Sequence, residues 1–172
     1  MSDATVLSRF LHYVSFDTQS ARESDSAPST AKQLKLAEAL VAELKAMGID
    51  DAHLGTGGVV YASIPATAGC ETSPAVGFIA HMDTSPDAPG ADAKPRVIRF
   101  TGTDVTLNEK EGLVFSTDQF PEIKKYAGED IVFTGGMNFH GVYECIPLKS
   151  LEKAADVAVK LAKLSAEIKS LA

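Results

Sequence analysis

The sequence predicts an α/β fold in which a mixed sheet is layered with helices. Two patterns indicate it: apolar residues recur at helical spacing near both ends of the chain, and short β-rich apolar runs lie between them. The third observation is size, because 172 residues with a hydrophobic content of 45% can bury one sizeable core. We therefore expect residues 1–172 to form a single domain, since helices and strands mixed in this way are typical of a sheet covered by helices.

Three helices are expected from periodicity and end signals. Asp3 can cap the first, and Pro147 marks the entry of the last, over roughly residues 148–171. The second is entered through Ser29 or Thr30, and Gly48 supplies its stop. The expected apolar stripes are Val6, Leu7, Phe10, Leu11 and Val14; Ala37, Leu40, Val41, Leu44 and Met47; and Leu151, Ala154, Val157, Leu161, Leu164, Ile168 and Leu171.

Strands are expected in the middle of the chain. Residues 57–66 and 75–82 read as two strands, and the second is apolar nearly throughout, which suggests a strand covered on both faces. Weaker strand candidates are 96–100, 113–116 and 130–134, with a short helix over 121–128. The polar residues 17–30 and the Pro/Gly/Asp-rich residues 84–95 are expected to be surface loops.

Composition limits the classes of binding partner and the cellular compartment that we expect. The net charge of −7 argues against nucleic acid and against an anionic membrane, because both select clustered Lys and Arg. No apolar segment approaches the ~20 residues that span a bilayer, and the first ten residues lack the pattern of a signal peptide. Cys70 and Cys145 are too few for a disulfide framework, so a cytoplasmic location is expected.

Residues 76–87, VGFIAHMDTSPD, end an apolar run in a histidine and a carboxylate. Residues i and i+2 of a strand point to the same side, so His81 and Asp83 should project together from the end of the expected strand. Imidazole is a good zinc ligand, and a neighbouring carboxylate commonly fixes its tautomer. The same spacing also fits a strand-end histidine that is hydrogen-bonded to Asp83 without any metal.

A second candidate is GGMNFHGVYEC, residues 135–145. Glycines around His140 would let the backbone approach a ligand closely, although a Gly-rich turn with an exposed histidine is the alternative. The other two histidines, His12 and His53, have no acidic partner at a suggestive spacing, so surface or filler roles are expected for them.

Three stretches together resemble the peptidase T family, bacterial tripeptide aminopeptidases among the zinc-dependent exopeptidases. They are FLHYVSFDTQS (10–20), GFIAHMDTSPD (77–87) and FTGGMNFHGVYECIPLKSLEKA (133–154). The resemblance implies that His81 binds one zinc ion, that Asp83 supports this site, and that His140 binds a second zinc ion. It also implies a small peptide substrate and a zinc-bound water whose pKa the metal lowers.

The chain departs from the family in its middle. Residues 1–134 resemble the N-terminal part of the catalytic domain and residues 135–172 its C-terminal part, with the joint near residues 133–136. The family's intervening bridging aspartate, Glu-Glu pair, further aspartate ligand and lid domain have no counterpart, and neither Glu-Glu nor Gly-x-Asp-Asp-Lys occurs in the sequence.

This departure predicts a partial catalytic domain that is inactive alone. At most one zinc ion is expected to bind, weakly, through His81 and His140. Asp83, Asp87, Glu144 and water are the candidates left to complete such a site. The alternative is a non-catalytic α/β remnant. Because the missing interval would have covered part of the sheet, some apolar surface should stay exposed and self-association is possible.

Overall fold

The computed structural model describes residues 5–134 and 143–167. Its helices are α1 (Val6–Tyr13), α2 (Gln33–Ala46) and α3 (Leu148–Glu167), with short 3-10 helices η1 (Thr56–Gly58) and η2 (Pro121–Tyr126). Its strands are β1 (His53–Leu54), β2 (Val60–Tyr61), β3 (Arg96–Arg99), β4 (Val105–Asn108), β5 (Leu113–Phe115), β6 (Asp130–Phe133) and β7 (Cys145–Pro147). The fold is therefore mixed helix and sheet, as predicted, but its sheets are small.

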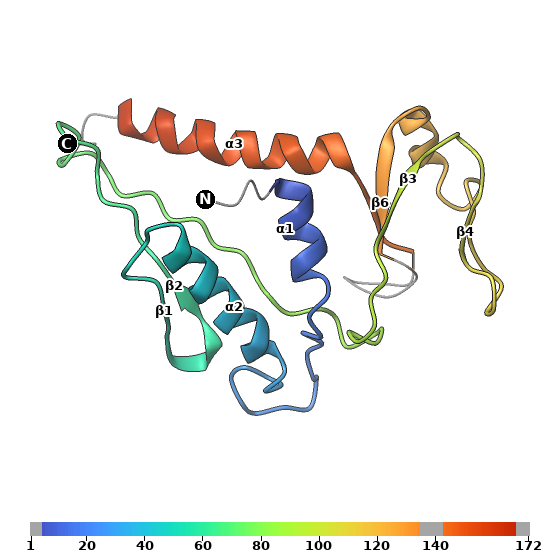
Figure 1. Cartoon of the computed structure of the whole chain (residues 1–172), viewed down its shortest axis with the longest axis horizontal. Coiled ribbons are helices and arrows are strands. Elements are labelled where there is room, and N and C mark those ends of the chain that lie inside the picture. The colour runs from blue at the N-terminus through green and yellow to red at the C-terminus, as the bar shows by residue number, and fades with distance from the viewer. Residues whose placement is uncertain (1–4, 135–142, 168–172) are drawn as a thin grey trace.

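The elements gather in two halves that α3 connects (Figure 1). Helices α1 and α2 lie with the β1–β2 pair in one half, and β3, β4 and β6 lie in the other. A long extended segment runs between the halves (Figure 1), and α3 contacts α1 as well as β6 and β7. None of the described helices is long and apolar enough to cross a membrane.

The main core surrounds β6, the central strand of an antiparallel sheet in the order β3-β6-β7. Ile98 pairs with Ile131 and Val97 with Val132, while Phe133 faces Cys145 across the other edge. All three apolar residues of β6 are fully buried, so this short strand is covered on both faces. The buried cluster consists of Phe100, Leu107, Phe115, Ile123, Ile131 and Phe133.

The helices form where the apolar periodicity predicts them, but their entries differ from the prediction. Thr5 caps α1 by accepting a hydrogen bond from the backbone N–H of Ser8, whereas the predicted cap, Asp3, lies outside the described residues. The entry predicted at Ser29 or Thr30 is wrong, because α2 begins at Gln33 without a side-chain cap and the Thr30 hydroxyl donates to the backbone carbonyl of Gln19 instead. That bond ties the start of α2 to the preceding loop.

The predicted strand at residues 75–82 is wrong. No strand forms there, and Val76, Phe78 and Ile79 are 45%, 59% and 101% exposed. An apolar run becomes a buried strand only if neighbouring strands supply hydrogen bonds and side chains that cover it, and none of the described strands pairs with this segment. The strand predicted at 57–66 likewise shrinks to the two residues of β2.

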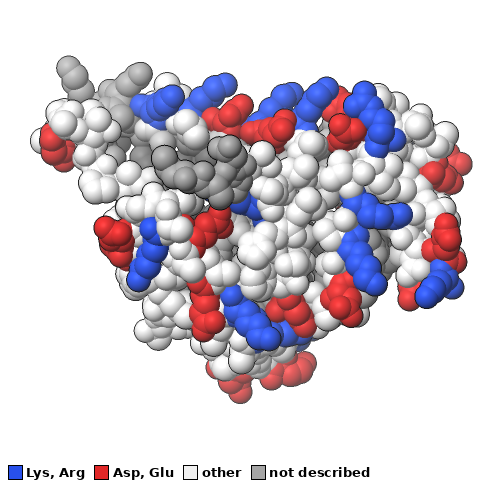
Figure 2. All heavy atoms as spheres, viewed as in Figure 1, with Lys and Arg blue, Asp and Glu red and all other residues white. Residues whose placement is uncertain are grey.

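Apolar side chains remain exposed elsewhere too, as expected of a partial domain. Val157, Leu161 and Leu164, which belong to the predicted stripe of the last helix, are each about half exposed on α3. Figure 2 shows that basic and acidic side chains lie interspersed on the face it presents. The exposed apolar surface that the sequence predicted is therefore confirmed along α3 and at residues 76–79.

Candidate functional site

The candidate site is built on a contact between two loops far apart in the sequence. The backbone N–H of Thr84 donates to the carbonyl of Thr18, and the N–H of Ser20 donates to the carbonyl of Thr84 at 2.9 Å. These bonds make a short parallel bridge between Gln19 and Thr84. The loop that follows α1 therefore fixes the backbone immediately after His81 and Asp83.

Side chains reinforce this loop contact. The Gln19 amide donates to the backbone carbonyls of Pro86 and Ala88, and Lys32 from the start of α2 pairs with Asp17 at 3.0 Å. Gly90 leaves no room for a side chain, since a Cβ there would lie 2.3 Å from Asp17 Oδ1. The three segments 17–20, 32 and 84–90 are thus held as one unit, which we name the loop clamp.

His81 and Asp83 lie in contact just before the loop clamp. The His81 Nδ1 lies 2.9 Å from the backbone oxygen of Asp83 and 3.1 Å from its Oδ1. Both neighbours are acceptors, so Nδ1 carries the proton and the ring's lone pair is on Nε2. Nε2 is then the nitrogen suited to a metal ion, with Asp83 as the orienting carboxylate.

Both side chains line a groove with a volume of about 700 Å³. One wall is α2, through Leu40, Leu44 and Met47, and another is the turn and strand at residues 57–61. Residues 78–83 form the remaining wall, so the groove has a mainly apolar lining that includes His81 and Asp83. A site of this kind could accept a small ligand with apolar side chains and one polar end.

A polar cluster of Arg9, Tyr13 and Glu43 joins α1 to α2 beside this groove. Arg9 Nε lies 2.6 Å from Glu43 Oε1, and the Tyr13 hydroxyl donates to Glu43 Oε2 at 2.5 Å. The hydrogen bonds from Tyr13 and Arg9 lower the pKa of the Glu43 carboxyl. Burial, together with the hydrogen bond to Glu43, raises the pKa of Tyr13 to about 12. The cluster is therefore a carboxylate held ionised between two donors.

The described residues bring no three His, Cys, Asp or Glu side chains together in a way that could hold a metal ion. His140 lies outside the described residues. Of the other candidates, Asp87 pairs with Arg22 and accepts from the Ser85 hydroxyl, and Glu144 lies at a different cavity. The described set therefore fits one histidine ligand with its supporting carboxylate, and does not fit a complete catalytic zinc site, which needs three protein ligands.

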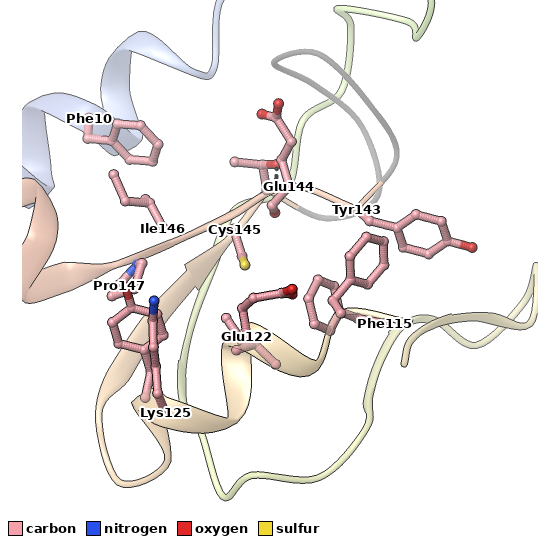
Figure 3. Close-up of a pocket in the computed structure, with 13 residues that line it drawn as sticks. Phe10, Phe115, Glu122, Lys125, Tyr143, Glu144, Cys145, Ile146 and Pro147 are labelled. Atoms are coloured by element: carbon pink, nitrogen blue, oxygen red, sulfur yellow. Dashed lines mark hydrogen bonds between the residues drawn. The ribbon is translucent and has the colours of Figure 1, made fainter. Parts of the chain in front are cut away.

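That second cavity, of about 670 Å³, lies between η2, β7 and α1 (Figure 3). Phe10, Phe115 and Tyr143 contribute aromatic rings, and Glu122 and Glu144 contribute carboxylates. The Cys145 sulfur points into it, towards the helix that carries Glu122. Burial and the nearby Glu144 raise the pKa of Cys145 to about 11, so the thiol stays protonated and is a poor metal ligand.

Sequence reasoning missed the loop clamp. Residues 17–30 were expected to form a polar surface loop, yet Thr18 is only 2% exposed. The sequence holds two signals: the run of polar residues DTQS (17–20) shortly after the first helix, and Gly90 between Pro89 and Ala91. Neither reveals its partner, because the contacts join residues more than sixty positions apart.

Comparison with known proteins gives close relatives. The chain is 46% identical over 137 residues to peptidase T of Parabacteroides distasonis, covering 80% of this chain and 34% of that protein. It is 42% identical over 139 residues to peptidase T of Halothermothrix orenii and 44% identical over 137 residues to peptidase T of Clostridium botulinum. The chain spans about one third of the length of these curated relatives. No family model matches it.

Proposed function

The chain is homologous to peptidase T over about four fifths of its length, and we propose that it is a shortened, cytoplasmic form of that aminopeptidase that keeps part of the metal site and does not hydrolyse peptides by itself. Its remaining activity would be the binding of at most one zinc ion, weakly, through His81 and His140. Small peptides are the substrates that the family relationship implies for the full-length enzyme.

The hydrogen-bonded pair of His81 and Asp83 is the observation that carries this proposal. The motif that resembles the family's first metal motif has its carboxylate against Nδ1 of the histidine, which leaves the Nε2 lone pair as the metal donor. The loop clamp fixes the backbone that follows. This arrangement supports one zinc ligand that is oriented before any metal arrives.

Hydrolysis needs more than this pair supplies. A catalytic zinc ion generally has three protein ligands, and a two-metal site needs bridging and terminal carboxylates that hold the ions ~3.5–4 Å apart. The sequence contains no Glu-Glu pair to supply the family's general base, and general-base catalysis contributes ~10²–10⁴-fold in rate. The proposal therefore assigns the chain metal binding without turnover, and no reaction step is derived through the ion.

Calorimetric titration with Zn²⁺ tests the proposal. The intact chain should bind no more than one equivalent, and His81→Ala or His140→Ala should each abolish the signal. His53→Ala is the matched control, because His53 is an exposed histidine whose Nδ1 contacts the backbone oxygen of Asp51 rather than a carboxylate. Tight binding of two equivalents, or binding that survives both alanine variants, would contradict the proposal.

The second candidate function is a working tripeptide aminopeptidase, which the identity of 42–46% to proteins named peptidase T favours. Incubation with a tripeptide in the presence of Zn²⁺ or Co²⁺ separates the two. We expect no hydrolysis above background, so that the N-terminal residue is released no faster than in a control sample without protein. Turnover that copurifies with the chain, and that a chelator abolishes, would establish the aminopeptidase instead.

A further inference from the structure

Residues 74–80 form an extended apolar segment whose backbone has no hydrogen-bond partner among the described residues. Ile79 is fully exposed, and Phe78 and Val76 are about half exposed. The segment carries no charge between Glu71 and His81. It therefore combines the side chains of a buried strand with the exposure of a loop.

Such a segment is suited to accept another strand. Consecutive unpaired N–H and C=O groups on an extended, β-branched and aromatic run are a template for pairing with a second chain. Pro74 has no N–H and bounds the run on one side, and Thr84, which is already bonded to Thr18 and Ser20, bounds it on the other. Within these bounds, the five residues 76–80 match the usual length of a strand, about 5–6 residues.

We propose that two copies of this chain pair through residues 76–80 as antiparallel strands centred on Phe78. A second copy is the occupant because an antiparallel strand is complementary to itself, so one surface serves both sides of a two-fold interface. The pairing residues end just before His81, and the inference does not depend on the proposed function.

The side chains favour this register. With Phe78 opposite its counterpart, Val76 faces Ala80 of the other copy and Ile79 faces Gly77. Gly77 has nothing within 4 Å of the position of a Cβ, so it leaves room for the exposed Ile79 of the other copy. Aromatic and β-branched cross-strand neighbours of this kind stabilise antiparallel pairs.

Charge favours the antiparallel direction. A parallel, in-register pair would set Asp83 beside Asp83 at the inter-strand distance of about 5 Å, and like charges directly opposite each other destabilise a sheet. In the antiparallel register Asp83 faces Ser73, ten residues from the other Asp83, which at ~3.4 Å per residue is about 34 Å away. The carboxylates then do not oppose association.

Sedimentation velocity over a range of protein concentrations tests the dimer. The intact chain should shift from monomer to dimer with rising concentration, and Ile79→Lys should weaken the dimer by about tenfold or more in Kd, since each copy would place a charge against Gly77. Ile64→Lys is the matched control, because Ile64 is 81% exposed but lies outside the segment. A monomer at all concentrations, open-ended growth beyond the dimer, or equal effects of the two variants would overturn the proposal.

Disulfide trapping tests the register. In a background of Cys70→Ser and Cys145→Ala, a mixture of Val76→Cys and Ala80→Cys chains should oxidise to the mixed dimer. The Val76→Cys chain alone should not crosslink, because the two copies of residue 76 lie four residues apart along the ribbon. Self-crosslinking of Val76→Cys would indicate parallel strands, and failure to form the mixed dimer would exclude the register.

Discussion

Tyr13→Phe removes the hydroxyl that joins α1 to α2 beside the candidate groove. In the structure that hydroxyl donates to Glu43 Oε2 at 2.5 Å, while Arg9 holds the other carboxylate oxygen. The substitution keeps the ring and its packing, and Glu43 keeps Arg9 as a partner. The variant therefore reports the hydrogen bond itself and leaves no unpaired buried charge.

The expected loss follows from the kind of bond. A hydrogen bond to a charged group contributes about 1.5–3 kcal/mol, and the lower end applies here because both side chains are partly exposed to water. We expect Tyr13→Phe to lower the free energy of unfolding by about 1.5 kcal/mol. For a protein of this size that is a fall of about 3–6 °C in Tm.

The same bond makes stability depend on pH in a defined direction. Free tyrosine has a pKa of 10.0, and the folded protein raises the pKa of Tyr13 to about 12. The native state therefore keeps this proton where the unfolded state loses it. The stabilisation of the folded state by the raised pKa of Tyr13 is therefore complete below pH 10 and is lost between pH 10 and about 12. Glu43, whose folded pKa is lowered, contributes above its unfolded value of 4.5, and this contribution is lost as the pH falls through the folded value.

Urea unfolding of the intact chain and of Tyr13→Phe measures both effects. The difference in unfolding free energy should be constant at neutral to mildly basic pH and shrink as the pH approaches 12. Phenolate absorbance should show one late-titrating tyrosine that the variant lacks. Tyr61→Phe is the control, because the half-exposed Tyr61 hydroxyl makes no hydrogen bond to the described residues. Equal small losses in both variants, or a difference that grows above pH 10, would refute the reasoning.

Two further substitutions probe the loop clamp and the core. Gly90→Ala should destabilise the protein by about 1–3 kcal/mol and speed hydrogen exchange at the Thr84 amide, because its Cβ would lie 2.3 Å from Asp17 Oδ1. Gly77→Ala is the control, because a Cβ there meets nothing within 4 Å, and in dilute, monomeric protein it should change neither the stability nor the exchange rate of the Thr84 amide. Equal effects of the two substitutions would show that the loop clamp is not tightly packed at Gly90. Phe133→Ala should lower the free energy of unfolding, measured in a thermal or urea melt, by about 3–5 kcal/mol. Phe133 is fully buried and packs edge-on against Phe115, with 5.4 Å between the ring centroids. Val97→Ala on the adjacent strand, 44% exposed, should stay within about 0.5 kcal/mol, and a comparable loss there would place the core elsewhere.

The helices and three strands around the core were predictable from the sequence, whereas β4 and β7 were not predicted. Apolar spacing located α1, α2 and α3 to within a few residues, and short β-rich runs located β3, β5 and β6. These elements follow from interactions over a few positions along the chain, which periodicity and end signals describe directly. The spacing of His81 and Asp83 also brought them together, because two residues' separation keeps them close even without a strand.

Only the tertiary structure decided what becomes of residues 75–82 and what holds the candidate site. The run has the composition of a central strand, yet a strand needs a neighbour to satisfy its backbone, and no described strand pairs with it. The loop clamp depends on Gln19 reaching Ala88 and on Gly90 fitting against Asp17, contacts that no local pattern encodes. The sequence by itself therefore determined which segments can form a helix or a strand, while contacts between distant segments determined which of them do so. The reason is that the hydrogen bonds and the burial of a strand depend on both of the segments that it joins.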